Sequence, residues 1–307
     1  MIMLPENSRW ADPLGLGAVT VNDPISLADV GIIAGHDYVT NNAVGDTNAP
    51  AVVASYGKAV WETEVALLSG SDSTIANGLY YGKRIYLFMT VAQVNAWHYW
   101  WLIAGNGVGN QGLLDNNAST TKRLFAVGQY SRFVRPGYYR MDATNTGPAL
   151  ISAYKDTVAG NFAIVAINTN SSTINQTFTL TNFATVTSVT PWITSATLNL
   201  ASQTAVAVTN SAFTYTLPAQ SIVTFVGQAA TNSASQISAI QVLGSNVLVT
   251  IPLVFGETYQ LQYSDSMVPT NWLNLGSSTN GLDGPLTVID PGGAQQLQRF
   301  YRFAITL

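Results

Sequence analysis

The first 135 residues alternate short apolar runs with stretches of helical periodicity. Apolar runs that predict strands occupy residues 1–4, 30–35, 59–63 and 94–101. Apolar side chains recur at near-helical spacing in residues 73–89 and again in residues 120–134, which predicts two helices. Strands that alternate with helices indicate about four parallel β/α units in this part of the chain.

The pattern changes at residue 138 to short strands joined by polar turns. Alternating β-branched segments such as FAIVAIN and SIVTFVG fill residues 138–228 and predict an antiparallel β-sandwich. The small polar segment AATNSASQ predicts a linker at residues 229–236. Alternation with period two then resumes, so residues 237–307 are expected to form a second β module of Ig-like size.

The composition narrows the classes of function. The 307 residues are 47% apolar but only 9% charged, against about 25% charged in an average soluble domain, which is typical of an extracellular, mostly β protein. A net charge of −4 without a basic stripe argues against nucleic acid as a partner. Cysteine is absent and histidine occurs twice, so neither a metal nor another cofactor is expected.

No targeting or membrane segment is expected. The chain has no run of 18 apolar residues, so it predicts no membrane-spanning helix. The first ten residues, MIMLPENSRW, have neither a charged n-region nor a small-residue cleavage site, so they do not predict a signal peptide.

Polar and aromatic residues cluster at the ends of the predicted strands, where the loops of parallel β/α proteins carry reactive groups. Two of the four glutamates of the chain lie in KAVWETEVALLSG, at the end of the third strand. The second strand ends in Gly-His-Asp-Tyr and the fourth carries Ala-Trp-His-Tyr-Trp-Trp. Aromatic walls beside a carboxylate and a histidine favour a sugar-binding cleft.

Several of these motifs occur in the order known from one enzyme family. LPE, GHDY, KAVWETE, NAWHYWWL and KRLFAVGQYSRFVRPGYYRMDAT follow one another and resemble the second half of glycoside hydrolase family 30, above all its bacterial endo-xylanases. The resemblance extends over about residues 1–228. It implies the last four units of a (β/α)8 TIM barrel in residues 1–137, followed by the side β-sandwich. It also implies a retaining mechanism with two catalytic glutamates.

The resemblance assigns roles to individual residues. Glu64 matches the catalytic nucleophile at the end of barrel strand seven. Glu62 lies on the same strand and would approach a sugar from the same side as Glu64, so it is expected to be an inward-facing barrel residue or a hydrogen-bond partner. The residues expected to orient the nucleophile or contact the sugar are His36, Tyr38, Trp10, Trp97, Tyr99 and Trp100.

The second catalytic carboxylate of the family has no match in this chain. The family places its acid/base glutamate between Asn and Pro, and no Asn-Glu-Pro occurs here; Glu6, in the Pro-Glu pair near the start, is a poor substitute. We therefore expect a truncated form without the acid/base half of the barrel. The loop at residues 102–107 also has no basic residue to bind a glucuronate side group.

The expected function is that of a secreted, retaining glycoside hydrolase acting on xylan or a related β-glycan. The alternative is a non-catalytic glycan-binding protein or an inactive fragment that keeps the aromatic residues. The module at residues 237–307 is expected to be a spacer or a sorting appendage, with attachment to carbohydrate or to the cell wall as its alternative function. In either case the expected partner is a polysaccharide.

Overall fold

A computed structural model describes most of the chain. The described residues are 2–4, 6–8, 10, 14–38, 56–66, 72–104, 111–156, 160–181, 183, 186–229, 237–253, 257–281 and 284–306. None of the helices in these ranges combines the length and the apolar character needed to cross a membrane.

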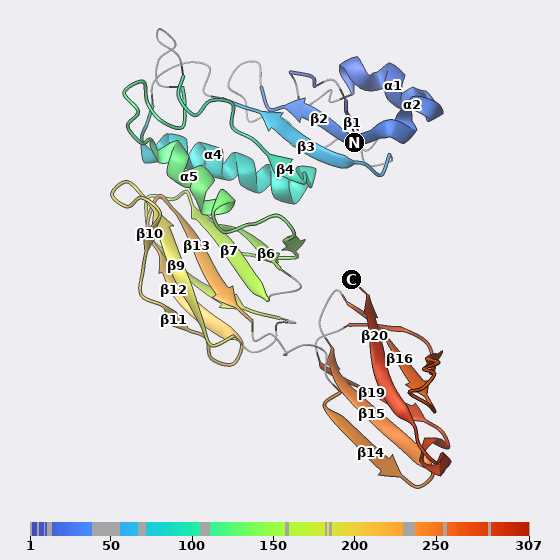
Figure 1. Ribbon diagram of the computed structural model, residues 1–307. Helices are drawn as coiled ribbons and strands as arrows, with labels where there is room; N and C mark the ends of the chain where they lie inside the picture. Colours follow the sequence, from blue (N-terminus) through green and yellow to red (C-terminus); the bar gives the residue numbers. More distant parts are fainter. Residues whose placement is uncertain are drawn as a thin grey trace.

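Four parallel strands form a sheet near the N-terminus (Figure 1). In spatial order they are β1 (Ile2–Met3), β2 (Val30–His36), β3 (Ala59–Glu64) and β4 (Ala96–Trp97). The central strand β2 has the nearly continuous apolar sequence VGIIAGH and is largely buried, as expected for a parallel strand that is covered on both faces. In the described residues β1 and β4 are the edges of this sheet.

The fourth strand is shorter than the sequence pattern predicts. Residues 94–101 were expected to be extended, but only Ala96 and Trp97 pair with β3. Beyond them the backbone leaves the ladder and the amide of Trp100 donates to the carbonyl of Val65 at 2.8 Å. The regular alternation of side chains expected for this run therefore ends after Trp97.

Both predicted helices are present. The helical elements are η1 (Gly15–Gly17), α1 (Ala18–Asn22), α2 (Pro24–Asp29), α4 (Ile75–Leu87), the π-helical turn η2 (Phe88–Ala92) and α5 (Lys122–Ser131). The carboxylate of Asp23 caps α2 by accepting from the amides of Ile25 and Ser26, and the hydroxyl of Thr121 caps α5.

Nine antiparallel strands follow. They are β5 (Tyr139–Met141), β6 (Leu150–Lys155), β7 (Asn161–Asn168), β8 (Ile174–Thr179), β9 (Ser188–Thr194), β10 (Ala201–Ser202), β11 (Val206–Ala207), β12 (Ala212–Leu217) and β13 (Ser221–Gln228). Seven of them form one sheet with β13 and β7 at its centre, and β8 and β12 pair separately.

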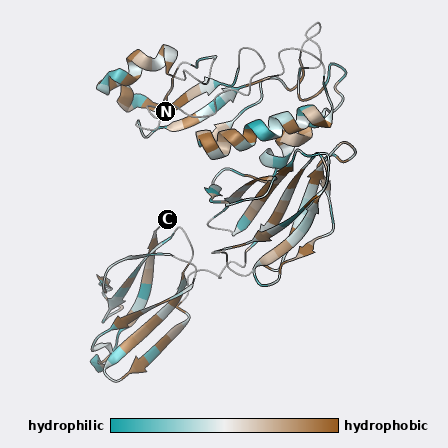
Figure 2. Cartoon of the chain, turned by 180° about the vertical axis from the view of Figure 1, so that it is seen from behind, coloured by the Kyte–Doolittle hydropathy of each residue, from teal (hydrophilic) through white to brown (hydrophobic). Residues whose placement is uncertain are grey.

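The large sheet is covered on both faces, which explains why β7 is buried along almost its whole length. Phe162 and Ile164 of β7 belong to the core that β8 and β12 cover. Val165 and Ile167 belong to a second core with helices α4 and α5. Figure 2 shows the resulting apolar residues along the strands and along α4. Side chains that alternate in direction along one strand thus serve two different cores.

The helices of the β/α region are therefore anchored on the sandwich. Gln129 of α5 donates to the hydroxyl of Thr194 and to the carbonyl of Ile222, and its own carbonyl accepts from Thr224. Ala229, the first residue of the predicted linker, packs in the sandwich core; residues 230–236 lie outside the described residues.

The C-terminal module contains two further sheets. Its elements are β14 (Ala239–Leu243), β15 (Asn246–Leu253), β16 (Thr258–Ser264), β17 (Leu273–Asn274), β18 (Thr279–Asn280), β19 (Gly284–Asp290), η3 (Gly293–Gln295) and β20 (Phe300–Thr306). Val249 of β15 and Leu261 of β16 pack in a core between the sheets. The predicted alternation is present, whereas an Ig-like topology stays a prediction.

Candidate active site

The carboxyl ends of the first three parallel strands are held together by backbone hydrogen bonds. The amide of His36 donates to the carbonyl of Asn7 at 2.8 Å, and the amide of Asp37 donates to the carbonyl of Glu64 at 2.9 Å. His36 and Glu64 are register partners in β2 and β3. Their side chains therefore emerge next to each other, as sequence analysis of the strand ends predicts.

Glu64 is the carboxylate on which these side chains converge. The hydroxyl of Tyr38 donates to its Oε1 at 2.8 Å, and Nε2 of His36 lies 3.6 Å from its Oε2. Burial and the hydrogen bond to Glu64 raise the pKa of Tyr38, so its hydroxyl stays protonated and able to donate. The side chain of Glu64 is 16% exposed, which leaves it accessible to a substrate.

Glu62 is hydrogen-bonded inside the protein, which confirms the expectation that it is a partner of its neighbours. Its side chain is fully buried, and its carboxyl oxygens accept from the amides of Glu64 at 3.1 Å and His98 at 3.0 Å. Burial raises the pKa of Glu62 well above its ordinary value, which favours the neutral form. A neutral Glu62 adds no negative charge beside Glu64.

A register shift separates the environments of the two glutamates. Gly35 pairs with Glu62, whereas the next residue, His36, pairs with Glu64, so Thr63 is an extra residue in β3. Such a bulge re-aims the side chains that follow it. This explains why Glu62 points into the protein while Glu64 stays accessible, although the residue spacing places both on one face.

Glu6 joins the cluster through His36. Nε2 of His36 lies 2.8 Å from Oε2 of Glu6, and the side chain of Glu6 is 30% exposed. The sequence presented Glu6 only as a poor substitute for the missing acid. The structure instead brings Glu6, His36 and Glu64 into one group whose nitrogen and oxygen atoms could bind a cation.

A buried ion pair that was not predicted from the sequence supports the end of β2. Nε of Arg84 donates to Asp37 at 2.7 Å, and a second guanidinium nitrogen contacts the other carboxylate oxygen. Burial raises the pKa of Asp37, and the pairing with Arg84 opposes this rise. In the sequence, the pair is indicated only by an arginine on the mostly apolar buried face of α4. This arginine does not identify its partner.

The aromatic residues predicted to contact sugar lie in different environments. Trp100 is 50% exposed, with its ring 6.1 Å from that of Trp101. Tyr99 is partly buried, and its hydroxyl donates to the carbonyl of Gln111 at 2.7 Å. Trp97 is partly buried and packs against core residues of α4 and η2. Of these three, Trp100 presents the largest free surface.

Trp10 differs most from expectation. Its side chain is only 3% exposed and packs edge-on against Phe88, with ring centroids 4.8 Å apart. Because Phe88, Ala92 and Val94 surround it, its ring cannot offer a face to a sugar. We therefore leave Trp10 out of the proposed site.

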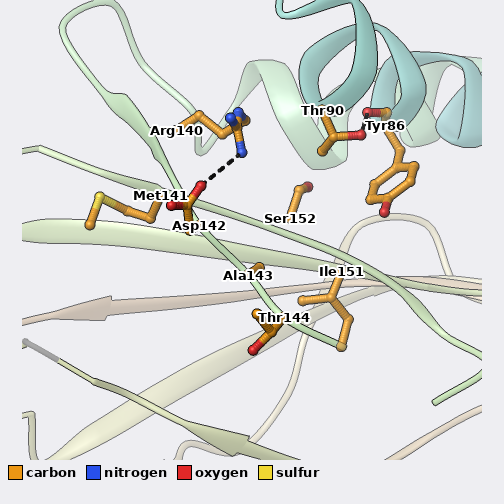
Figure 3. Close-up of a pocket in the computed structure, with 9 residues that line it drawn as sticks. All are labelled: Tyr86, Thr90, Arg140, Met141, Asp142, Ala143, Thr144, Ile151 and Ser152. Atoms are coloured by element: carbon orange, nitrogen blue, oxygen red, sulfur yellow. Dashed lines mark hydrogen bonds and ion pairs between the residues drawn. The ribbon is translucent and has the colours of Figure 1, made fainter. Parts of the chain in front are cut away.

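A separate hollow lies between η2 and the sandwich (Figure 3). It encloses about 350 Å³, and its lining residues are Tyr86, Thr90, Arg140, Met141, Asp142, Ala143, Thr144, Ile151 and Ser152. None of these residues belongs to the cluster around Glu64. The hollow is therefore not the candidate active site.

The chain is similar to proteins that are named as xylanases. Glucuronoxylanase XynC from Bacillus subtilis is 34% identical over 236 residues, an alignment that covers 73% of this chain and 52% of the relative. The predicted resemblance to glycoside hydrolase family 30 is confirmed. No protein-family model matches the chain.

Solved structures of family 30 show the same relationship. An endoxylanase of family 30 from Clostridium papyrosolvens superposes with a TM-score of 0.63 at 33% identity, covering 74% of this chain and 56% of that one. The subfamily 8 xylanase Xyn30A from Clostridium acetobutylicum gives the same values. The chain thus spans about half the length of its family 30 relatives.

Proposed function

We propose that this chain carries the nucleophile side of a retaining glycosidase cleft that acts on xylan or a related β-glycan. The observation that carries the proposal is the position of Glu64, at the carboxyl end of β3 and bound by Tyr38. Its relatives named as xylanases favour xylan as the substrate class. The low content of charged residues is typical of extracellular β proteins, so we propose that the protein is secreted.

Glu64 would act as the nucleophile. In a retaining mechanism one carboxylate attacks the anomeric carbon and forms a glycosyl ester, while an acid protonates the departing oxygen; water then hydrolyses the ester. Tyr38 holds Oε1 of Glu64, which leaves Oε2 for the attack. Trp100, which is half exposed, would stack on a sugar ring, because its surface is free to contact one.

The acid/base is not among the carboxylates near Glu64 in the described residues. Glu62 is fully buried and accepts from two backbone amides, and Asp37 is paired with Arg84. Glu6 lies close, but both it and Glu64 contact the same nitrogen of His36. A carboxylate oxygen of each lies within 4.8 Å of the other, against about 5–5.5 Å between the two carboxyl groups of retaining enzymes, so we do not assign Glu6 as the acid.

We infer that the four parallel strands correspond to strands five to eight of a family 30 barrel. The strand count, the parallel order and the half-length match to relatives support this inference. The acid/base would then belong to the other half of the barrel. General acid catalysis contributes about 10²–10⁴-fold to such reactions, so hydrolysis of natural xylan by the chain alone would be slow by that factor.

The experiment uses an aryl β-xyloside with a good leaving group, which needs little help from an acid. We expect slow turnover that Glu64→Gln abolishes. In a separate incubation with an activated aryl 2-deoxy-2-fluoro-β-xyloside, we expect Glu64 to displace the aryl alcohol and keep the 2-fluoro sugar as an ester, which mass spectrometry of the protein detects. Glu257→Gln, a change of the same kind in the C-terminal module, should leave the rate unaltered. Turnover that persists in Glu64→Gln would refute the assigned nucleophile.

Substrate choice depends on the loop that begins at Leu102. The loop carries no basic residue in positions 102–107; Leu102 and Ile103 are exposed, and residues 105–107 lie outside the described residues. We therefore propose that the substrate is not restricted to glucuronate-bearing xylan. Equal binding of linear xylan and glucuronoxylan in affinity electrophoresis is the expected result, and a strong preference for glucuronoxylan would contradict it.

A second candidate function is glycan binding without hydrolysis. It is favoured by the exposed face of Trp100 and by the lack of a facing acid among the described residues. Retained binding of xylan, with no aryl xyloside turnover and no trapped ester, would select this function. Trp100→Ala should weaken such binding, whereas Trp10→Phe, in the core, should not.

A further inference from the structure

We propose that Glu6, His36 and Glu64 form a binding site for Zn²⁺. Their coordinating atoms all lie within 4.8 Å of one another. Nε2 of His36 is 2.8 Å from Oε2 of Glu6 and 3.6 Å from Oε2 of Glu64. Around a tetrahedral ion with bonds of about 2.0–2.2 Å, neighbouring ligand atoms are about 3.3–3.6 Å apart, so small side-chain adjustments suffice.

The donor set selects the metal. One imidazole nitrogen and two carboxylate oxygens suit Zn²⁺, which in catalytic sites commonly has three protein ligands and an open fourth position. Mg²⁺ and Ca²⁺ prefer oxygen ligands throughout. The partial exposure of Glu6 and Glu64 allows an ion to enter and a water molecule to complete the coordination.

The surrounding structure holds the ligands in place. Tyr38 donates to Oε1 of Glu64 and leaves Oε2 available, while the amide of His36 is bound by the carbonyl of Asn7. Hydrogen bonds of this kind to a metal-binding residue orient its side chain and restrict its rotation. The strand ladder thus preorganises the three side chains.

Charge also favours a cation. In the described part of the chain, His36 is the only basic side chain that contacts either carboxylate. Arg84 of α4, whose guanidinium is buried, is paired with Asp37 instead. A divalent ion between Glu6 and Glu64 would therefore neutralise two neighbouring negative groups.

Zinc and sugar would compete for Glu64. The ion would coordinate Oε2, the oxygen that the proposed nucleophile needs for attack, so bound zinc would block the reaction. The zinc site itself does not rest on the proposed function, because binding of the ion requires only the three side chains. Failure of xyloside hydrolysis would leave the binding measurement unaffected.

Nuclear magnetic resonance provides a direct test, because the chain contains only two histidines. Zn²⁺ is titrated into the full chain with ¹³C-labelled histidine, and a parallel titration with Mg²⁺ serves as the control. We expect the His36 imidazole signals to change until one Zn²⁺ ion is bound per chain, while the His98 signals stay the same. In the Mg²⁺ titration, we expect the signals of both histidines to stay the same. Isothermal titration calorimetry supplies the dissociation constant.

Matched substitutions decide whether these residues hold the ion. Loss of a residue that only supports a metal ligand weakens metal binding by about 10–100-fold. Glu6→Gln and His36→Ala each remove a ligand itself, so each should weaken Zn²⁺ binding by more than this. His98→Ala and Glu257→Gln should leave it unchanged. Circular dichroism shows whether each variant is folded. If His36→Ala is unfolded, the isosteric variant Glu6→Gln provides the test of metal binding. Absence of saturable binding, or binding insensitive to Glu6→Gln, would overturn the proposal.

Discussion

Glu64 owes its environment to a few individual contacts. Tyr38 donates to one carboxylate oxygen of Glu64, and His36 lies near the other. The Glu64 amide donates to the carboxyl group of Glu62, whose pKa is raised by burial. A hydrogen bond to a carboxylate contributes more than one between neutral groups. Single polar atoms at this strand end should therefore have measurable effects on the proposed chemistry.

Removing the Tyr38 hydroxyl tests the first of these contacts. Tyr38→Phe deletes the donor to Oε1 of Glu64, and a hydrogen bond to a charged group contributes about 1.5–3 kcal/mol. We expect kcat/KM on the aryl xyloside to fall by roughly 10- to 100-fold. Tyr139→Phe, at an exposed position of β5, is the matched control. An unchanged rate in Tyr38→Phe would show that the contact has no part in turnover.

Arg84 is expected to matter for stability. Arg84→Met would leave the carboxylate of Asp37 buried without its partner, and such a change destabilises a protein by about 3–5 kcal/mol. Urea unfolding measures the loss. Arg140→Met breaks only a surface pair whose Asp142 is 99% exposed, so it should change stability by no more than about 1 kcal/mol. Similar losses in both variants would contradict the assignment.

At the scale of elements, the large sheet links the site to the rest of the fold. Helices α4 and α5 cover one face of β7 and β13, and β8 and β12 cover the other. The end of β2 is in turn tied to α4 through Asp37 and Arg84. Substitutions that disturb packing of the sheet should therefore also disturb α4, the helix that supports the candidate site.

Gly227 of β13 tests how tightly this sheet is packed. It pairs with Phe162 of β7, and a Cβ at position 227 would lie 2.3 Å from that buried ring. Gly227→Ala should destabilise the protein by about 1–3 kcal/mol through overpacking. Gly128→Ala in α5 meets only an ordinary 3.4 Å contact and should stabilise by up to about 1 kcal/mol. Chemical denaturation compares the two; equal effects would refute the steric argument.

At the scale of the whole molecule, the hydrophobic clusters of the described residues fall into two groups along the chain. Every hydrophobic cluster in the described residues lies either within residues 4–229 or within residues 237–305. The β/α region, in contrast, shares a core with the sandwich. Stability should therefore divide into one contribution from residues 2–229 and another from the C-terminal module.

Two matched leucines test this division in the full chain. Leu261 and Leu217 are almost completely buried in the module and in the sandwich, respectively, and a buried Leu→Ala change destabilises by about 2–5 kcal/mol. We expect Leu261→Ala to lower only one transition in differential scanning calorimetry and Leu217→Ala to lower only the other. A single transition that both variants shift equally would show one cooperative unit.

Much of the architecture follows from periodicity, because helices and strands place apolar side chains at different intervals. The two long helices, the long sandwich strands and the start of β2 were all predicted in this way. Short elements were missed or overextended: β4 is two residues long where eight were expected. Apolar and aromatic residues also fill the loop after β4, so their pattern alone cannot mark where pairing ends.

For the candidate site, too, the sequence predicted some features and missed others. Local sequence located Glu64, His36 and Tyr38 at the ends of predicted strands, and the resemblance to family 30 proposed their roles. Three features arise from contacts between distant segments: the approach of Glu6 to His36, the pairing of Asp37 with Arg84 and the burial of Trp10. Periodicity reports which face of an element a side chain occupies. Only packing of the elements decides which charged groups meet and which aromatic rings are covered.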